Sequence, residues 1–298
     1  MNPETPNGGA SMNTSVNTSP PRKPRDDEID VYGLTHPGKV RKVNQDHFLL
    51  GSLRRKLDII GTSLPASELP ALNERAVFLA MIADGVGGTE NGEEASRIAL
   101  EEATQYLSQC TDCYYHGDAE SDVFVDTLQA AATRCHAKVA ERAAEDPDRR
   151  GMATTLTLFI GVWPWSYLLQ VGDSRYYVYR NRELSQVTRD QTMAQELADQ
   201  GVMTRSAAFA SRWANVLSSS IGGKQTAPVV TRMTSHWDNI HLMSSDGLTK
   251  HVSDERIAER LRTMQSAKQA CEALLQDALE GGGTDNISII VARTIART

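Results

Sequence analysis

The sequence predicts an α+β domain with antiparallel sheets, and two observations support this. Apolar runs with the length of strands occur in groups, and the helical patterns lie together between those groups instead of alternating with them. Between residues 153 and 188, three apolar runs are broken by the turn sequences WPW, GDS and RNRE, which is typical of an antiparallel meander. A layered fold with antiparallel sheets follows from this grouping.

The first half of the chain contains three predicted strands and two predicted helices. Residues 53–75 between the second and third strands are mixed in character, with two prolines, and predict a loop or loose hairpin. The predicted strands are IDVYGLTHPG (29–38, with a turn at its end), DHFLLGSL (46–53) and AVFLAMIADGVGG (76–88, ending in a glycine-rich turn). The predicted helices are residues 92–109 and 121–145, in which apolar residues recur at helical spacing.

The second half follows the meander with helices and two further strands. A short helix is expected at residues 192–201, ending at Gly201, and a polar segment without a clear pattern continues to Gly223. The remaining elements are a strand in NIHLMSSDGL (239–248), helices at 254–264 and 267–280, and a last strand in NISIIVART (286–294).

Composition limits the domain organisation and the class of protein. Residues 1–28 are rich in Asn, Thr, Ser, Pro and Gly, so we expect a disordered tail before a domain at 29–298. A net charge of −7 argues against nucleic-acid binding. No apolar run approaches the roughly 18 residues of a membrane span, and no signal peptide is evident. We therefore expect a cytoplasmic protein without membrane contact, monomeric because no heptad pattern is visible.

The cysteines suggest a weak alternative metal site. Cys110 and Cys113 form a C-x-x-C pair in CTDCYYH, together with His116. A zinc site would need a second pair with matching spacing, and none is present. We therefore favour the interpretation that these are two half-buried thiols near a helix end.

Five aspartates stand at the ends of predicted strands. They are Asp46, Asp84, Asp173, Asp246 and Asp285. An Asp-Gly pair alone is a common turn, but the ends of aligned strands converge at one edge, where five carboxylates would repel one another without cations between them. Oxygen ligands without a convincing set of histidines or cysteines indicate Mg²⁺ or Mn²⁺ and argue against zinc.

The order of eight short motifs resembles the type 2C metal-dependent serine/threonine protein phosphatases, most closely their bacterial members. Each motif alone is weakly specific, whereas eight in the family's order are strongly specific, and together they cover about residues 30–295. The motifs are VRKVNQD, ADGVGG, GMATTLTL, VGDSRYYVYR, VTRDQT, NVLSSSIGG, MSSDGLTKHV and GGTDNISIIV. The resemblance implies a four-layer α-β-β-α sandwich, in which two antiparallel sheets are flanked by helices and metals bind at one edge.

The resemblance also implies a role for each matching residue. Asp84 corresponds to the carboxylate that bridges two metal ions, and the Gly85 carbonyl to a ligand of the first ion. Asp246 and Asp285 match ligands of the second ion, and Asn286 follows as the family pattern requires. Asp46 matches the acid that holds water beside the metals, and Arg41 matches the phosphate-binding arginine. Asp173 matches a residue linked to a third, weaker metal site in bacterial relatives.

Elementary chemistry agrees with these implied roles. Two cations about 4 Å apart would neutralise a phosphomonoester dianion and lower the pKa of a shared water molecule. The planar fork of Arg41 can bind two phosphate oxygens, which a lysine cannot do. The glycines at 85, 87 and 88 would let the backbone turn sharply and bring a carbonyl close to a metal.

Several assignments stay open from the sequence. Lys42 is an alternative phosphate contact to Arg41, and Asp173 could instead stabilise its turn through Arg175. Val86 stands where many eukaryotic relatives have a histidine thought to protonate the leaving group, and valine cannot do this. The following histidines have no ligand-like spacing and are expected in surface or core roles: His36, His47, His136, His236, His241 and His251.

The resemblance implies that residues 190–223 form the flap beside the active site, where Ser206 or a neighbour could gate the substrate. We expect metal-dependent hydrolysis of phosphoserine and phosphothreonine in proteins, opposing a bacterial serine/threonine kinase. Two alternatives are an inactive phosphatase-like binding module and a hydrolase of small phosphoesters. An inactive relative would usually lack some of the metal-binding carboxylates, and all are present here.

Overall fold

The structure, a computed structural model, describes residues 22–65, 68, 73–86, 90–110 and 122–296. Their strands form two antiparallel sheets, as predicted. The five-stranded sheet has the order β1 (Ile29–His36), β11 (Ile287–Thr294), β10 (Ile240–Ser244), β7 (Arg175–Arg180), β8 (Glu183–Gln186). The other sheet has the order β2 (Asp46–Lys56), β3 (Asn73–Val86), β5 (Leu156–Val162), β6 (Trp165–Val171), β9 (Val229–Thr234), and β4 (Ala153–Thr154) pairs with β3.

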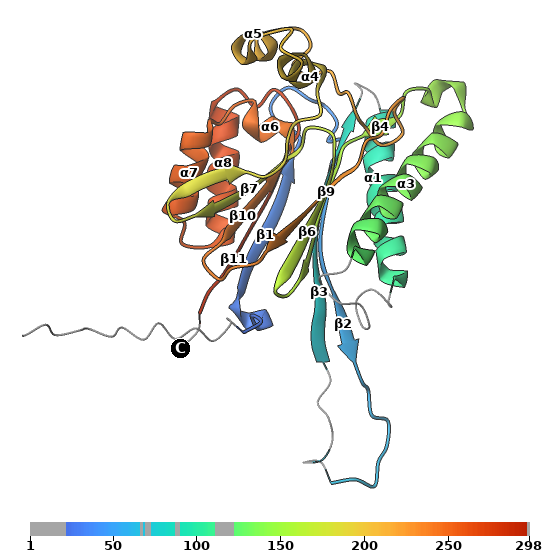
Figure 1. Cartoon of the computed structure of the whole chain (residues 1–298), viewed down its shortest axis with the longest axis vertical. Coiled ribbons are helices and arrows are strands. Elements are labelled where there is room, and N and C mark those ends of the chain that lie inside the picture. Colours follow the sequence, from blue (N-terminus) through green and yellow to red (C-terminus); the bar gives the residue numbers. More distant parts are fainter. Residues whose placement is uncertain (1–21, 66–67, 69–72, 87–89, 111–121, 297–298) are drawn as a thin grey trace, which may run out of the picture.

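Helices cover the outer face of each sheet, which confirms the predicted four-layer sandwich (Figure 1). α1 (Glu90–Gln109) and α3 (Val123–Ala144) pack on the six-stranded sheet, whereas α7 (Asp254–Arg262) and α8 (Ala267–Glu280) pack on the five-stranded one. The shorter elements are α4 (Met193–Asp199), α5 (Arg205–Phe209), α6 (Asp246–Thr249) and two 3₁₀ turns, Asp26–Glu28 and Pro147–Arg149. None of the helices in the described part of the chain combines the length and the apolar character that crossing a membrane requires.

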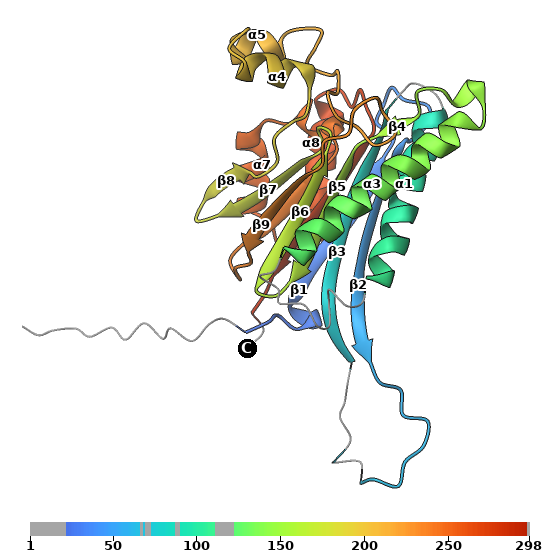
Figure 2. The ribbon, with the colours of Figure 1, turned by 45° about the vertical axis from the view of Figure 1, so that its right-hand side comes forward.

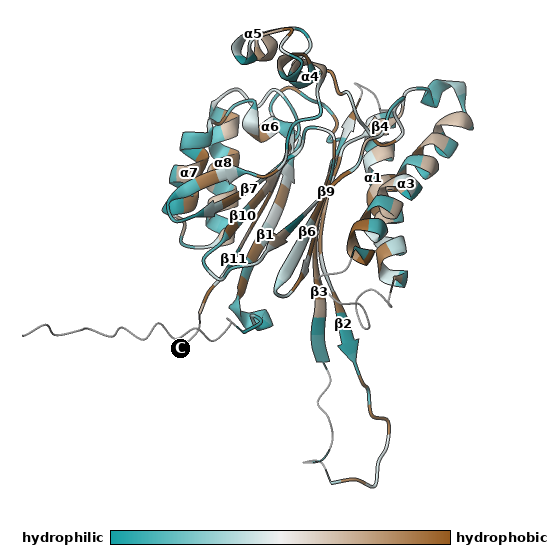
Figure 3. Cartoon of the chain, viewed as in Figure 1, coloured by the Kyte–Doolittle hydropathy of each residue, from teal (hydrophilic) through white to brown (hydrophobic). Residues whose placement is uncertain are grey.

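Each interface between layers has its own buried cluster. The cluster between the two sheets contains Ala80, Ile82, Leu168, Tyr176, Met243 and Ile290. Because β3 contributes both to this cluster and to the one beneath α1 and α3, it is buried on both faces and reads as a continuous apolar run. The apolar strands and the polar outer helix faces are visible in Figure 3.

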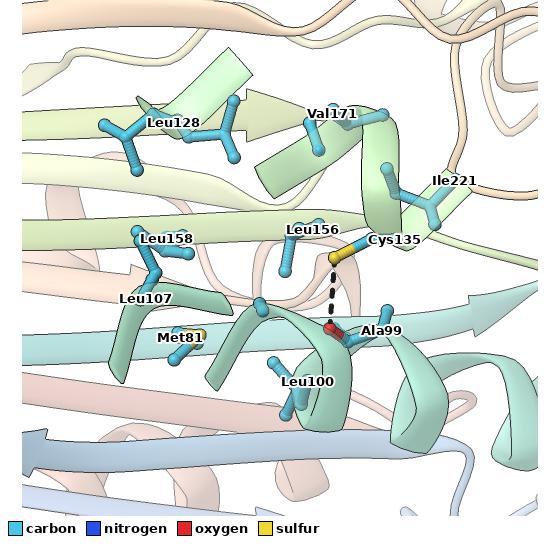
Figure 4. Packing of buried hydrophobic residues seen from close by; sticks show 14 of the residues in the cluster. Met81, Ala99, Leu100, Leu107, Leu128, Cys135, Leu156, Leu158, Val171 and Ile221 are labelled. Carbon is cyan, nitrogen blue, oxygen red and sulfur yellow. Dashed lines mark hydrogen bonds between the residues drawn. The ribbon is translucent and has the colours of Figure 1, made fainter. Parts of the chain in front are cut away.

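The contact between α1 and α3 is close because small residues lie along it. Ala99 and Cys135 are fully buried there, and the Cys135 thiol donates a hydrogen bond to the Ala99 carbonyl (3.3 Å; Figure 4). Leu107 and Leu128 fill the same cluster above the sheet. The helical spacing of these residues is therefore satisfied by burial of one face of each helix, as expected.

Three short elements differ from the sequence expectation. The structure contains a strand at Val229–Thr234 and a helix at Arg205–Phe209, where the sequence indicates no regular element. It also contains a helix at Asp246–Thr249, where the predicted strand at 239–248 was expected to end. β9 is an edge strand with few buried residues, so its apolar pattern is weak. The two helices are only one turn long, too short to show a helical period.

The described chain begins before residue 28, where the sequence places the end of the disordered tail. The Arg22 guanidinium lies over the Trp237 ring (5.0 Å) and binds the buried carboxylate of Glu28. Trp237 Nε1 donates to the Arg22 carbonyl (2.8 Å), and Arg75 donates to the Pro24 carbonyl (2.7 Å). Ionic and aromatic contacts therefore hold a segment that has too few apolar residues to predict order. The tail through residue 21 lies outside the described residues.

Strands β2 and β3 form a long hairpin whose ends differ in character. One end carries Asp46 opposite Asp84, and the pairing continues to Lys56 opposite Asn73. The register shifts between Leu53 and Arg54, a bulge near the far end of the hairpin. Figure 2 shows this far end projecting at the pole of the molecule opposite α4 and α5.

Asp277 joins the two helices that cover the five-stranded sheet. It lies on α8, and its side chain is only 9% exposed. Arg256 and Arg260 on α7 each donate two hydrogen bonds to its carboxylate, at 2.7–3.0 Å. The hydrogen bonds from Arg260 and Arg256 lower the pKa of Asp277 to about 2, against the effect of burial. The charged form is therefore the one that the folded state favours.

We expect Asp277→Asn to lower the free energy of unfolding at pH 7 by about 2 kcal/mol, because charge-assisted hydrogen bonds to both arginines are lost. The pKa of Asp277 is lower in the folded state, so its contribution is present above the unfolded pKa near 4 and is lost as pH falls towards 2. Urea denaturation at several pH values measures this.

Glu259→Gln is the matched control, because Glu259 is 51% exposed and pairs with the same Arg256. We expect it to change the free energy of unfolding by less than about 0.5 kcal/mol. Equal effects of the two substitutions, or an effect of Asp277→Asn that does not shrink in acid, would contradict the role of Asp277.

Candidate metal centre

The five predicted aspartates are brought to one end of the sandwich, around an open cleft of about 260 Å³. Asp84, Asp173, Asp246 and Asp285 line the cleft, and Asp46 lies buried beside Asp84. The other lining residues are Arg41, Gln45, Gly85, Val86, Thr155, Asn215, Leu217 and Lys250. The described lining contains no histidine and no cysteine. Its polar groups are carboxylates, amides, a hydroxyl and two basic side chains.

Both sheets contribute to the cleft through the ends of their strands. Asp46 begins β2 and Asp84 lies near the end of β3 in the six-stranded sheet, and Asp173 follows β6. Asp246 follows β10 and Asp285 precedes β11 in the five-stranded sheet. Antiparallel strands end on this edge in both sheets, and the carboxylates therefore face one another.

Asp46 is held by a buried network of hydroxyl groups. Ser245 Oγ donates to Asp46 Oδ2 (2.7 Å), and the Ser288 backbone N–H donates to Ser245 Oγ (2.9 Å). Asp46 is only 2% exposed, and its Oδ1 atom has no hydrogen-bond partner among the described residues. One carboxylate oxygen is thus fixed by the protein, while the other remains available.

Gly85 allows the backbone beside Asp84 to pack against helix α1. A Cβ atom at Gly85 would lie 2.2 Å from the carbonyl oxygen of Gly92 and 2.9 Å from that of Gln45. Thr155 holds Asp84 from the other side, because its hydroxyl accepts a hydrogen bond from the Asp84 N–H (3.0 Å). The close approach of the Gly92 and Gln45 carbonyl oxygens therefore explains why position 85 is a glycine. Gly87 and Gly88 lie outside the described residues.

Asp173 does not pair with Arg175, which was the alternative role open from the sequence. Arg175 instead binds Asp190, with the shortest contact at 2.7 Å, and also donates to the Tyr177 hydroxyl. Asp173 is 9% exposed and faces the cleft. Asp190, in the motif VTRDQT, therefore supplies the local ion pair and leaves Asp173 for the cleft.

Lys250 joins Asp246 to Asp285, and Arg41 binds Asp285 as well. The Lys250 ammonium lies 2.6 Å from Asp246 Oδ2 and 2.7 Å from Asp285 Oδ2. Arg41 binds Asp285 with both arms of its guanidinium, at 2.8 and 3.0 Å. Lys42, the alternative to Arg41, does not line the cleft. Lys250 was not predicted as a residue of the site, although its spacing of four residues from Asp246 is a signal for a contact across one helical turn.

Burial and mutual repulsion raise the pKa of most of these carboxyl groups. Burial raises the pKa of Asp46 to about 7 and that of Asp173 to about 8, with further contributions from Asp246 in both cases. The pKa of Asp84 is raised well above its ordinary value by burial and by Asp46. Asp285 differs, because hydrogen bonds from Arg41 and Lys250 outweigh burial and lower its pKa.

The donor set fits a hard divalent cation. Asp46 Oδ1 and Asp246 Oδ1 are buried oxygens without a hydrogen-bond partner among the described residues, and carboxylate and carbonyl oxygens are the ligands of Mg²⁺ and Mn²⁺. As they stand, no three His, Cys, Asp or Glu side chains in the described residues are close enough together to hold one ion.

Asn286 positions the loop that carries Arg41. Its side-chain nitrogen donates to the carbonyls of Pro37 and Val43 (3.0 Å each), and its side-chain oxygen accepts the Gln45 N–H (2.9 Å). Asn286 is 4% exposed, so all three bonds are shielded from water. One side chain next to Asp285 thereby fixes the entry and exit of the β1–β2 connection.

The predicted flap contributes to the cleft through residues other than the one expected. Asn215 and Leu217 line the cleft, whereas Ser206 lies exposed on α5 and contacts Thr204. Figure 1 shows α4 and α5 above the end of the sandwich. Cys110 is half-buried, and Cys113 and His116 lie outside the described residues.

Comparison with known proteins gives a consistent result. The sequence profile of the family described as protein phosphatase 2C matches residues 69–281. The chain is 33% identical over 229 residues to the serine/threonine protein phosphatase PstP of Mycobacterium tuberculosis, covering 76% of this chain. It spans only 43% of the length of that relative. It is 26% identical to a serine/threonine phosphatase of Listeria monocytogenes, covering 72% of this chain and 83% of the relative.

The fold agrees with that of solved structures. The crystal structure of M. tuberculosis PstP superposes with a TM-score of 0.73 at 28% identity, covering 90% of this chain and 99% of the other. A structure of the PstP catalytic domain in complex with two manganese ions gives a TM-score of 0.70 at 27% identity, with the same coverage of both chains.

We expect Gly85→Ala to lower the free energy of unfolding by about 2 kcal/mol or more, because the added Cβ would collide with backbone oxygens that cannot move independently. Gly61→Ala is the control, because a Cβ there meets nothing within 4 Å. Urea denaturation of both variants measures the difference. Two equally stable variants would contradict the close packing at Gly85.

Proposed function

Because the chain belongs to the protein phosphatase 2C family, we propose that it hydrolyses phosphoserine and phosphothreonine in proteins with the help of Mg²⁺ or Mn²⁺. The observation that carries this proposal is the convergence of all five expected aspartates around one cleft, beside an arginine. Among the residues that the structure describes, nothing donates a hydrogen bond to one buried oxygen of Asp46 or of Asp246. An inactive binding module has no need for such an arrangement, which costs stability.

The residues that would hold two ions are those of the cleft wall. We propose Asp84 and the Gly85 carbonyl for one side, Asp246 and Asp285 for the other, and Asp46 as the acid that holds water. Asp173 would support a third, weaker site. The ions, when bound, supply positive charge that lowers the pKa of a water molecule and offsets the charge of the phosphate.

The protein itself supplies orientation. Arg41 reaches the cleft with a planar guanidinium, which can bind two phosphate oxygens once it leaves Asp285. Asp46 can accept a hydrogen bond from water through its free oxygen while Ser245 holds the other. Val86 is 37% exposed at the cleft, and its side chain has no acidic proton to donate. The leaving oxygen would therefore take its proton from another source.

The position of the cleft favours a protein substrate. It is open to solvent at the end of the sandwich, and its outer wall includes Asn215 and Leu217 of the flap. A side-chain phosphate on an extended segment could enter this opening, and the flap would contact the residues around it. We further propose that the chain acts as a cytoplasmic monomer that opposes a serine/threonine kinase.

We expect Asp84→Asn to reduce phosphate release from a phosphothreonine peptide by at least about 100-fold, because even an outer-shell partner of a metal is worth 10- to 100-fold. The assay compares Mn²⁺ with excess EDTA. Asp58→Asn is the control, because Asp58 is exposed and pairs only with Lys56 in the described structure. Wild-type turnover in Asp84→Asn, or release that persists in EDTA, would exclude the proposed chemistry.

We expect Arg41→Lys to raise the KM for the same peptide about tenfold, because a lysine cannot replace bidentate binding of phosphate. Lys42→Ala tests the alternative contact and should leave KM unchanged, since Lys42 does not line the cleft. Steady-state kinetics at saturating Mn²⁺ measure both variants. The reverse result, with KM raised by Lys42→Ala alone, would assign the phosphate contact to Lys42.

A further inference from the structure

Lys250 is a cation built into the acidic cleft. Its ammonium group lies between a carboxylate that follows β10 and one that precedes β11, 2.6 Å from Asp246 Oδ2 and 2.7 Å from Asp285 Oδ2. The lysine side chain is 26% exposed and each carboxylate is 19% exposed. The contact is therefore partly shielded from water and stronger than an ordinary surface ion pair.

Local structure explains why the lysine reaches this place. Asp246 begins the single turn of α6, and Lys250 follows at its end, four residues later. Side chains with this spacing lie one above the other on a helix. Gly247 lets the turn pack against the chain beside Asp285, because a Cβ there would lie 1.9 Å from the Asn286 carbonyl oxygen. The turn thus brings Lys250 to both carboxylates at once.

The lysine uses the oxygens that a divalent ion would need. An ion bound by both Asp246 and Asp285 could reach Asp246 through Oδ1, which has no hydrogen-bond partner in the described residues. At Asp285 the ion would have to displace the Lys250 ammonium group from Oδ2 or the Arg41 guanidinium from Oδ1. Lys250 and Asp173 line the same cleft, so the positive charge of the ammonium group also acts near that carboxylate. A further cation near Asp173 would be repelled by the same charge.

We propose that Lys250 is an internal counter-ion of the cleft, which competes with divalent ions for Asp246 and Asp285 and opposes a third ion beside Asp173. This inference rests on the proposed function, because it requires that the cleft bind divalent ions. Its consequence is that the wild-type chain binds fewer ions, or binds them more weakly, than its five aspartates alone would allow.

The test is a Mn²⁺ titration of the metal-free full-length chain at one pH, with free Mn²⁺ followed by electron paramagnetic resonance. Lys250→Met removes the charge and keeps an unbranched side chain of nearly the same length, and Lys250→Arg keeps the charge. Lys224→Met is the matched control, because Lys224 is an exposed lysine away from the cleft lining. We expect Lys250→Met to bind Mn²⁺ about tenfold more tightly, or to bind one more ion.

The other variants and a second measurement keep the result decisive. Lys250→Arg and Lys224→Met should match the wild-type chain. In EDTA, Lys250→Met should melt at a lower temperature than wild type, because two neighbouring carboxylates lose their shared partner, and it should gain more from added Mn²⁺. If Lys250→Met does not fold, Lys250→Gln serves instead, since it keeps a hydrogen-bond donor without the charge.

The outcomes separate this inference from the proposed function. If the wild-type chain binds Mn²⁺ and Lys250→Met binds it with equal or lower affinity, the inference is overturned and the proposed function stands. Unchanged Mn²⁺ binding with a raised KM for phosphopeptide would instead assign Lys250 to the substrate phosphate. If neither chain binds Mn²⁺, both proposals fail. Binding by Lys250→Met alone would support the inference and show that the wild-type cleft is closed to metal.

Discussion

The mutual repulsion of buried carboxylates is the constraint on which the rest of this structure depends. Five aspartates meet where two sheets end, and burial raises the pKa of Asp46, Asp84, Asp173 and Asp246. Such a cluster lowers stability unless hydrogen bonds and positive charges offset it. Ser245 supports Asp46, while Arg41 and Lys250 bind Asp285. The hydrogen bonds and ion pairs around the cleft thus mainly stabilise the negative charge that is concentrated there.

The sandwich provides the rigidity that this arrangement needs. Asp46 and Asp84 are opposite one another in a ladder of paired strands, so their spacing is set by backbone hydrogen bonds. Asp246 and Asp285 adjoin neighbouring strands of the other sheet, and the cluster between the sheets fixes one pair relative to the other. The outer helices bury the remaining faces, and none of their described side chains contributes a charge to the cleft. Variation in the helices and in the flap can therefore occur while the carboxylates stay in place.

The layers and the acidic cluster could be predicted from the sequence because both leave periodic or repeated signals. Apolar runs mark β3 and β11, and an aspartate at a strand end recurs five times. The edge strand β9 and the one-turn helices α5 and α6 leave no period, so they were missed. The contacts of Lys250, Asn286 and Asp190 depend on which loops lie together in the fold. The spacing of residues along the chain does not determine which loops these are, so the contacts could not be predicted. The metal ligands themselves stay a prediction, carried by resemblance and by the geometry of the cleft.

The bulge in the β2–β3 hairpin separates two regions with different tolerance to change. A change in register of one residue would reverse which face of a strand each side chain occupies, and at the cleft it would remove Asp46 from Asp84. The irregularity at Leu53 and Arg54 lies between the paired aspartates and the projecting end of the hairpin. Residues inserted after Lys56 would lie beyond the last strand pair, so the register at Asp46 and Asp84 would not change. This end of the molecule is therefore the place to graft a tag, a fluorophore or a peptide epitope on the chain.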